Sequence, residues 1–218
     1  MPASPLRPGF GPTLPALLQA RLGDGARAAL AVVAGAAALL AVAAALVALG
    51  GSDEQLVHDD DPVFNLVYDA GRLRPADPRG GELARLEGRR GRVSVAVTVR
   101  PLRVPPVRGD VAKGFLPLHA QLYMDRLRRR DRTFAIRDEG RSTVNDSPGY
   151  QIAYRTGSPG RFTYWREVFV VPDEEAPREG VVLAFRNRRP DRIGAPAFEL
   201  VHAARSALRS FAFGTEAA

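Results

Sequence analysis

The sequence predicts an α+β fold, a largely antiparallel sheet flanked by helices, preceded by one N-terminal transmembrane helix. Three observations carry this prediction. An uncharged apolar run fills residues 28–49, runs of alternating apolar residues recur downstream (most clearly over 92–99), and segments 111–130 and 196–211 have helical spacing of apolar residues. The order is strands, a helix, at least four strands and a final helix, which is typical of an α+β domain.

Composition narrows the possibilities. The chain has 218 residues, enough for one ordinary domain plus additional segments. It has no cysteine, which excludes disulfides, thiolate nucleophiles and cysteine-ligated metals. The formal net charge is +7, and Lys113 is the only lysine. Such a bias toward arginine is typical of a GC-rich coding sequence. It also fits an anionic partner, although the charge is spread along the chain rather than clustered.

The N-terminal residues predict a membrane anchor. Residues 1–27 are rich in proline and glycine and are expected to be disordered. Residues 28–49 contain no charged or polar side chain, and as a helix they would span roughly 33 Å, close to the thickness of a bilayer core. The alternative, a buried helix of a soluble protein, would need apolar surroundings on every side, which a small domain does not provide.

The flanking charges predict the orientation of this span. Arg7, Arg21 and Arg27 precede it, whereas acidic residues dominate 53–61. The positive side stays in the cytoplasm, so the C-terminal domain is expected outside it, as in a single-pass signal-anchor protein of a bacterial envelope. A cleaved signal peptide is the alternative, because 48-ALG-50 resembles a cleavage site. We favour the uncleaved anchor because the apolar run is longer than a usual signal core.

An acidic linker is predicted over 50–61 and one domain over 62–214. Strands are expected at 63–68, 82–88 and 92–99. In the last of these, Val93, Val95, Val97 and Val99 point to one side. Pro101, Pro105 and Pro106 are expected to end the sheet.

A helix is predicted over 111–130. Its apolar face is expected to consist of Val111, Phe115, Leu118, Leu122 and Leu127. Pro117 would either kink a long helix or start a shorter one. Four arginines in 126–130 lie near the helix C-terminus. Favourable interaction with the helix dipole is the simplest interpretation, and a phosphate or lipid-head site is the alternative.

The second half of the domain alternates strands with turn residues. Strands are expected at 133–137, 150–156, 161–171 and 180–186, with turns at 145–149, 157–160 and 172–180. The last helix, 196–211, begins with a proline suited to a first turn. Its core face is predicted to consist of Phe198, Val201, Ala204, Leu208 and Phe211.

The hairpin over 150–171 carries the clearest functional signal. A loop at 157–160 would place Thr156 opposite Arg161 and Ile152 opposite Trp165. One face of this hairpin is then expected in the core. Its members are Tyr150, Ile152, Tyr154, Trp165, Phe169 and Val171, with Glu167 among them.

The other face of the hairpin is the candidate ligand- or partner-binding surface. Its residues are Gln151, Arg155, Tyr164 and Arg166. Guanidinium hydrogen bonds and ring stacking would suit an anionic or planar ligand. Alternatively, the arginine stems simply cover apolar sheet surface. A register slip of one residue would exchange the two faces.

The order of elements resembles the PsbP-like superfamily, which includes PsbP of the oxygen-evolving complex and the Ran-binding Mog proteins. The resemblance covers about residues 62–214 and rests on the strand after 62-PVFNLVY-68, the stretches SPGYQIAYR and GVVLAFR, and a terminal helix ending in SFAFG. It implies an α/β/α sandwich around an antiparallel sheet and a role in binding or assembly. It implies no catalytic residues, and neither photosystem nor Ran binding is carried over.

No catalytic, metal or cofactor site is predicted. The chain lacks the common nucleophile, phosphate-binding and zinc-protease motifs. The three histidines, His58, His119 and His202, are interpreted as packed or solvated side chains, and 58-HDDD-61 is unlike a closed metal shell. We therefore expect a non-catalytic, membrane-anchored envelope protein that presents an extracytoplasmic interaction or accessory module to an envelope protein partner. The alternative is a domain that binds a small or anionic ligand. Nucleic acid is not expected as a partner.

Overall fold

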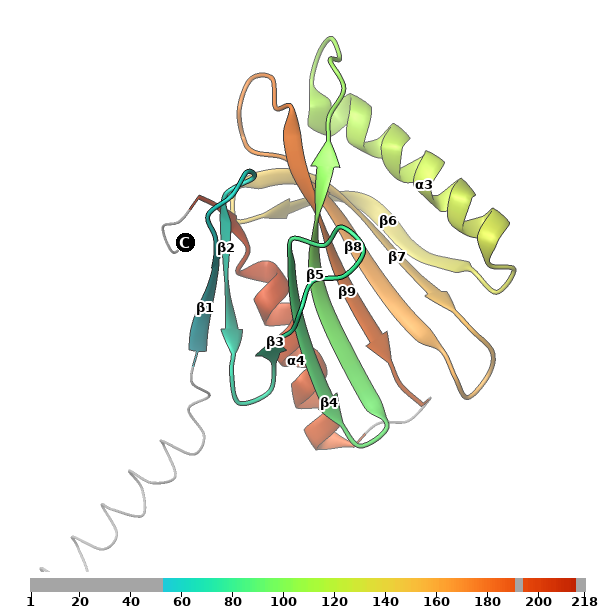
Figure 1. Ribbon diagram of the computed structural model, residues 1–218. Helices are drawn as coiled ribbons and strands as arrows, with labels where there is room; N and C mark the ends of the chain where they lie inside the picture. The colour runs from blue at the N-terminus through green and yellow to red at the C-terminus, as the bar shows by residue number, and fades with distance from the viewer. Residues whose placement is uncertain (1–52, 191–193, 215–218) are drawn as a thin grey trace, which may run out of the picture. The chain divides into compact units, whose positions relative to one another are not determined.

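The computed structural model describes residues 53–190 and 194–214 (Figure 1). These described residues belong to one compact unit. The predicted segments 1–27 and 28–49 lie outside the described residues. Within the described ranges, neither helix is long and apolar enough to cross a bilayer.

Two antiparallel sheets form the domain. The smaller has the order β1–β2–β10, and the larger has the order β3–β4–β5–β9–β8–β7–β6. The strands are β1 (Asp53–His58), β2 (Phe64–Asp69), β3 (Arg74–Pro75), β4 (Ala84–Arg90), β5 (Val93–Arg103), β6 (Ala135–Val144), β7 (Ser147–Thr156), β8 (Thr163–Val170), β9 (Glu179–Arg188) and β10 (Ala212–Phe213). The α+β class and antiparallel sheet are therefore as predicted. Strand β1, however, occupies half of the predicted linker 50–61, because it pairs along its whole length with β2.

The centre of the large sheet is buried on both faces. Val93, Val95, Val97 and Val99 share one buried face of β5, as predicted. The expected end of the sheet at Pro101 was wrong, because β5 continues to Arg103 and Pro101 pairs with Val181 of β9. Strand β4 pairs with β5 only as far as Val99. Beyond Val99 one edge of β5 has no neighbouring strand, so a backbone N–H is not needed on that edge and a proline is tolerated.

A two-residue turn joins β6 to β7. Asn145 and Asp146 have φ values of 40° and 64°, which these residue types tolerate better than most. The sequence predicted a longer turn, over 145–149. Because the observed turn has only two residues, β6 continues to Val144 and β7 begins at Ser147.

The β7–β8 hairpin has a different register from the predicted one. Thr156 pairs with Thr163, Tyr154 with Trp165 and Ile152 with Glu167. The predicted register was wrong by two residues, because the connection runs through residue 162 rather than ending at Gly160. A shift of two preserves which side chains share a face, so the predicted partition of the hairpin survived.

Helix α4 (Ala195–Arg209) covers one face of the large sheet and also packs against β2 (Figure 1). Its buried residues are Ala197, Leu200, Val201, Ala203, Ala204, Ala207 and Leu208. Pro196 lies in its first turn, as predicted. Phe198 was expected in the core but is 60% exposed, because Ala197 and Val201 occupy the buried side of the first turns. Phe211, just past the helix, is fully buried.

A π-helical turn, η1 (Val111–Phe115), and helix α3 (Leu116–Arg130) lie on the opposite face of the sheet (Figure 1). Pro117 starts α3 rather than kinking it. Leu118 and Leu122 were expected on the core face but are 57% and 54% exposed. The core face is instead formed by Leu116, Ala120 and Met124, because α3 starts at Leu116 and the turn before it is wound differently.

A buried carboxylate joins α3 to the sheet. Glu167 of β8 is 1% exposed. It accepts hydrogen bonds from the phenols of Tyr154 at 2.6 Å and Tyr123 at 2.9 Å, and Arg100 Nη2 lies 2.6 Å away. Burial and the charge of Glu167 raise the pKa of both phenols, so both remain protonated donors. The polar side chain that interrupts the predicted core face is thus fully partnered, and this network is structural.

Candidate partner-binding face

All four predicted site residues lie on one face of the large sheet, the side that α4 partly covers. Gln151 and Arg155 come from β7, and Tyr164 and Arg166 come from β8. Arg155 pairs directly with Tyr164 across the strands, and Arg166 Nη1 donates a hydrogen bond of 3.2 Å to Gln151 Oε1. The structure therefore brings these residues together. Each is half-buried, so each keeps part of its surface in solvent.

Two arginines outside the predicted set stack on Tyr164. The guanidinium carbons of Arg189 and Arg137 lie 4.6 Å and 5.5 Å from the ring centroid. Beside them, Arg155 lies 4.5 Å from the Phe162 centroid. Arg137 lies two residues after Ala135, which pairs with Arg155, so alternation along β6 places it on the same face. That face could be assigned only once the pairing of β6 with β7 was known, so the sequence did not identify Arg137.

Helix α4 adds two further arginines, Arg205 and Arg209. With Arg166 and Gln151 they line a hollow of about 130 Å³ at the edge of the helix. Both are spaced four residues apart on the exposed side of α4. That spacing is visible in the sequence and could have identified them as neighbours. Their approach to β8 depends on how α4 lies across the sheet, which the sequence does not reveal.

We call this surface the arginine–aromatic face. Its members are Arg137, Gln151, Arg155, Phe162, Tyr164, Arg166, Arg189, Arg205 and Arg209. Within the described ranges, none of its arginines forms an ion pair with a carboxylate. Partial desolvation, followed by the charges of Arg166, Arg189 and Arg209, lowers the pKa of Arg205. The face therefore holds uncompensated positive charge around half-buried aromatic rings.

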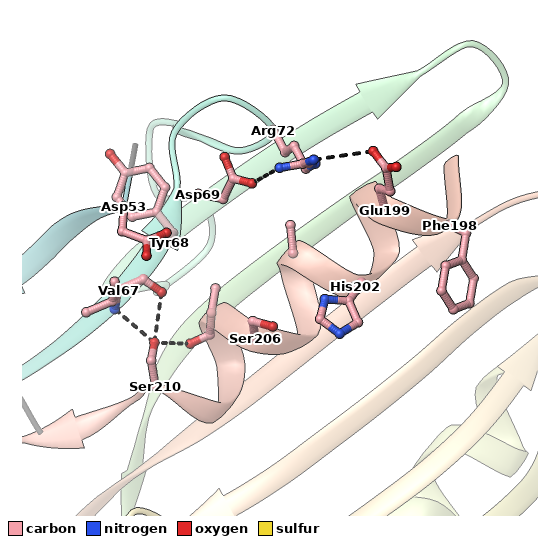
Figure 2. A pocket seen from close by; sticks show the side chains of 12 residues that line it. Asp53, Val67, Tyr68, Asp69, Arg72, Phe198, Glu199, His202, Ser206 and Ser210 are labelled. Atoms are coloured by element: carbon pink, nitrogen blue, oxygen red, sulfur yellow. Dashed lines mark hydrogen bonds and ion pairs between the residues drawn. The ribbon is translucent and has the colours of Figure 1, made fainter. Parts of the chain in front are cut away.

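A larger cavity, about 450 Å³, lies between β2 and α4 (Figure 2). Three of its charged groups pair with one another, since Arg72 bridges Asp69 and, at 3.3 Å, Glu199. At its other end, Ser210 Oγ accepts a hydrogen bond of 2.9 Å from the Val67 N–H. The exposed Phe198 ring stands at the rim, as Figure 2 shows. Because Arg72 is already paired with two carboxylates, this cavity is a weaker candidate for an anionic partner than the arginine–aromatic face.

His119 and His58 pack against aromatic rings outside the arginine–aromatic face. His119 sits between the rings of Phe115 and Phe169, with centroid distances of 5.3 Å and 5.2 Å. Burial, and secondarily the charge of Arg126, lowers its pKa. His58 stacks on Phe64 at 4.8 Å. In the part of the chain that the structure describes, no three His, Asp or Glu side chains are grouped to hold a metal ion.

Comparison with known proteins gives structural similarity at low sequence identity. No protein-family model and no curated protein matches the chain. Similar solved structures include PsbP of Synechocystis sp. PCC 6803, with 12% identity and a TM-score of 0.47 over 76% of this chain and 94% of that one. They also include the Ran-binding protein Mog1p of Saccharomyces cerevisiae, with 8% identity and a TM-score of 0.46 over 75% of this chain and 96% of that one.

A third similar structure is LpqN of Mycobacterium tuberculosis, which is described as involved in cell envelope biogenesis. It has 13% identity and a TM-score of 0.46 over 75% of this chain and 92% of that one. PsbP and a Ran-binding Mog protein, both members of the superfamily that the sequence resembles, are thus among the structurally similar proteins. At such identities the similarity concerns the fold, and it does not extend to binding or activity.

Proposed function

We propose that this protein is a membrane-anchored accessory protein of a bacterial envelope. In this proposal its domain lies outside the cytoplasm and binds an acidic partner protein through the arginine–aromatic face. The envelope setting is supported by the apolar segment 28–49 and its flanking charges. LpqN is compatible with that setting but does not carry the argument.

The single observation that supports binding is the uncompensated charge of the arginine–aromatic face. The partly or fully buried Arg85 and Arg100 are paired, with Glu82 and Glu87 and with Glu167 respectively. On the arginine–aromatic face the half-buried Arg155, Arg166 and Arg189 form no ion pair among the described residues, although they are clustered. Like charges held together repel one another, and an acidic partner would relieve that repulsion. Arginine and tyrosine are also the residue types that contribute most to protein interfaces.

The anchor would add to this affinity. Only residues 50–52 separate the predicted span from the first residue of β1. A domain tethered this closely to a bilayer meets membrane-bound partners at a raised effective concentration. Modest affinity at the face would therefore suffice for a stable complex.

The test is in-cell crosslinking of the full-length protein, followed by capture and mass spectrometry. An Arg155→Ala/Arg166→Ala variant is compared with an Arg90→Ala/Arg108→Ala control. Both pairs remove two positive charges, but Arg90 and Arg108 are exposed and belong to no described ion pair. We expect one acidic partner to be lost in the first variant and retained in the second. Equal loss, or equal retention, would contradict a role for this face.

The orientation has its own test. A reporter that is active only outside the cytoplasm, fused after Ala218, is expected to be active. Activity of a cytoplasm-only reporter at the same position would contradict the extracytoplasmic placement and, with it, the envelope role.

A second candidate function, the binding of a small anionic ligand, is favoured by one observation. The hollow between β8 and α4 brings three arginines to one concave surface. If crosslinking is unchanged in the Arg155→Ala/Arg166→Ala variant, small-ligand binding remains the alternative, and it then has to be shown by binding of an anion at the hollow itself.

A further inference from the structure

The hollow of about 130 Å³ beside the C-terminal half of α4 has a polar rim and an apolar floor. The rim consists of Ser142, Thr143, Gln151, Arg166, Arg205 and Arg209. The floor consists of the buried side chains of Val144, Val168, Phe185 and Leu208. Its volume corresponds to about four water molecules in the liquid. The site therefore has room for a small polar group rather than for a whole drug-sized ligand.

The charge around the hollow is not balanced by the protein. Three guanidinium groups come from two elements, Arg166 from β8 and Arg205 and Arg209 from α4, and none has a carboxylate partner among the described ion pairs. Helix α4 ends at Arg209, and a helix C-terminus carries only about half a negative charge. That is insufficient to offset three cations.

Gln151 holds one of these cations in position. Its Oε1 accepts from Arg166 Nη1 at 3.2 Å, and its Nε2 donates to Asp138 Oδ2 at 3.2 Å. Asp138 is thus engaged by the amide, and it forms no ion pair with an arginine of the rim. The amide fixes the side of Arg166 that faces β7 and leaves its other guanidinium N–H groups free to donate toward the hollow.

We infer that this hollow receives a phosphoryl group, either free phosphate or the phosphate of a lipid headgroup. A phosphate monoester carries about −1.5 to −2 charges and three strong acceptor oxygens, which matches three converging arginines better than the single charge of a carboxylate. Arg205 and Arg209 would contact it from the helix side and Arg166 from the sheet, and Ser142 and Thr143 also line the hollow. The inference rests on the proposed binding role of the arginine–aromatic face and names one chemical group for it.

The test uses the full-length protein in a neutral detergent. One arm titrates inorganic phosphate at constant ionic strength, with acetate as the comparison anion, and a second titrates short-chain phosphatidic acid. Binding is followed by the rise of the thermal midpoint, since a ligand of the folded state stabilises it. We expect saturable stabilisation by a phosphate-bearing probe and none by acetate. Stabilisation by phosphate alone would identify a free-phosphate site, and stabilisation by phosphatidic acid alone a headgroup site.

Variants localise the effect. Arg166→Gln and Arg205→Gln are each expected to raise the dissociation constant by about tenfold or more, as for loss of a charge-assisted hydrogen bond. Arg108→Gln removes an exposed, unpaired arginine elsewhere and is expected to bind normally. Because Arg166 and Arg205 are at the surface, the midpoints without ligand are expected to change little, which separates loss of binding from loss of folding.

The outcomes separate this inference from the proposed function. If neither probe binds, if acetate binds equally, or if Arg166→Gln and Arg205→Gln bind normally, the phosphoryl site is wrong. Partner crosslinking that still depends on Arg155 and Arg166 would then leave the proposed function intact. Phosphate binding without a crosslinked partner would instead support the site and contradict the protein-binding role.

Discussion

Tyr154 donates a hydrogen bond of 2.6 Å to Glu167 across the β7–β8 hairpin, beneath helix α3. Arg100 of β5 also contacts Glu167 from within the sheet, at 2.6 Å, and the Tyr123 phenol of α3 donates to the same carboxylate at 2.9 Å, which links the helix to the sheet. A buried carboxylate must be fully partnered to be tolerated. The Glu167 network thus fixes the position of α3 relative to β8, and it leaves the opposite face of β8 for the arginine–aromatic surface.

Replacing Glu167 by alanine is expected to destabilise the domain by about 3 kcal/mol. That is the lower end of the range for breaking a buried ion pair, because Arg100 retains some contact with solvent. Tyr123→Phe, which removes one hydrogen bond and little volume, is expected to cost about 1 kcal/mol. Urea unfolding of a fragment spanning 51–218 measures both. Equal effects would show that the charge of Glu167 contributes nothing beyond one hydrogen bond.

The two faces of the hairpin can be distinguished by substitutions at adjacent residues. Trp165 stacks on Tyr154 at 5.9 Å and packs against the core beneath α3, whereas Tyr164 points to the arginine–aromatic face. Trp165→Ala is expected to lower the free energy of unfolding by about 3 kcal/mol, and Tyr164→Ala by about 1 kcal/mol or less. Thermal and urea unfolding measure both values. The reverse order would mean that the faces are exchanged.

Helix α3 offers a similar comparison. Leu118→Ser and Leu122→Ser are expected to change stability by less than about 0.5 kcal/mol, because both leucines are exposed. Met124→Ala, in the buried face of the same helix, is expected to cost about 2 kcal/mol or more. A large loss at Leu118, measured by urea unfolding, would contradict the observed rotation of the helix.

Stability is expected to fall on acidification through His119. Burial lowers the pKa of this histidine in the folded domain below its ordinary value of 6.5. Below pH 6.5 the unfolded chain therefore binds a proton that the folded chain does not, so the folded state loses stability as pH falls toward the lowered pKa. Above pH 6.5 His119 is neutral in both the folded and the unfolded chain, so its titration no longer lowers the free energy of unfolding. Urea unfolding between pH 7.5 and about 5 is expected to show a shallower decline in His119→Gln than in the wild type, and an identical decline would contradict this role of His119.

Much of the fold was accessible from the sequence because its signals are local. Alternation in 92–99 identified β5, and Pro196 with the apolar spacing after it identified α4. The side chains that share a face of the β7–β8 hairpin were also predicted, since a register error of two residues leaves the alternation unchanged. For the same reason Gln151, Arg155, Tyr164 and Arg166 were correctly placed on one surface.

The tertiary structure decided the features that depend on residues distant in sequence. Pairing with β2 made β1 a strand, and the unpaired side of β5 tolerated Pro101. A helix that starts at Leu116 turned Leu118 to solvent, and the pairing of β6 with β7 brought Arg137 to within 5.5 Å of the Tyr164 ring centroid. The approach of α4 to β8 completed the arginine hollow with Arg205 and Arg209. The periodicity of a sequence specifies which residues lie on the same face of one helix or strand. Packing between elements decides whether that face contacts the core, another element or solvent.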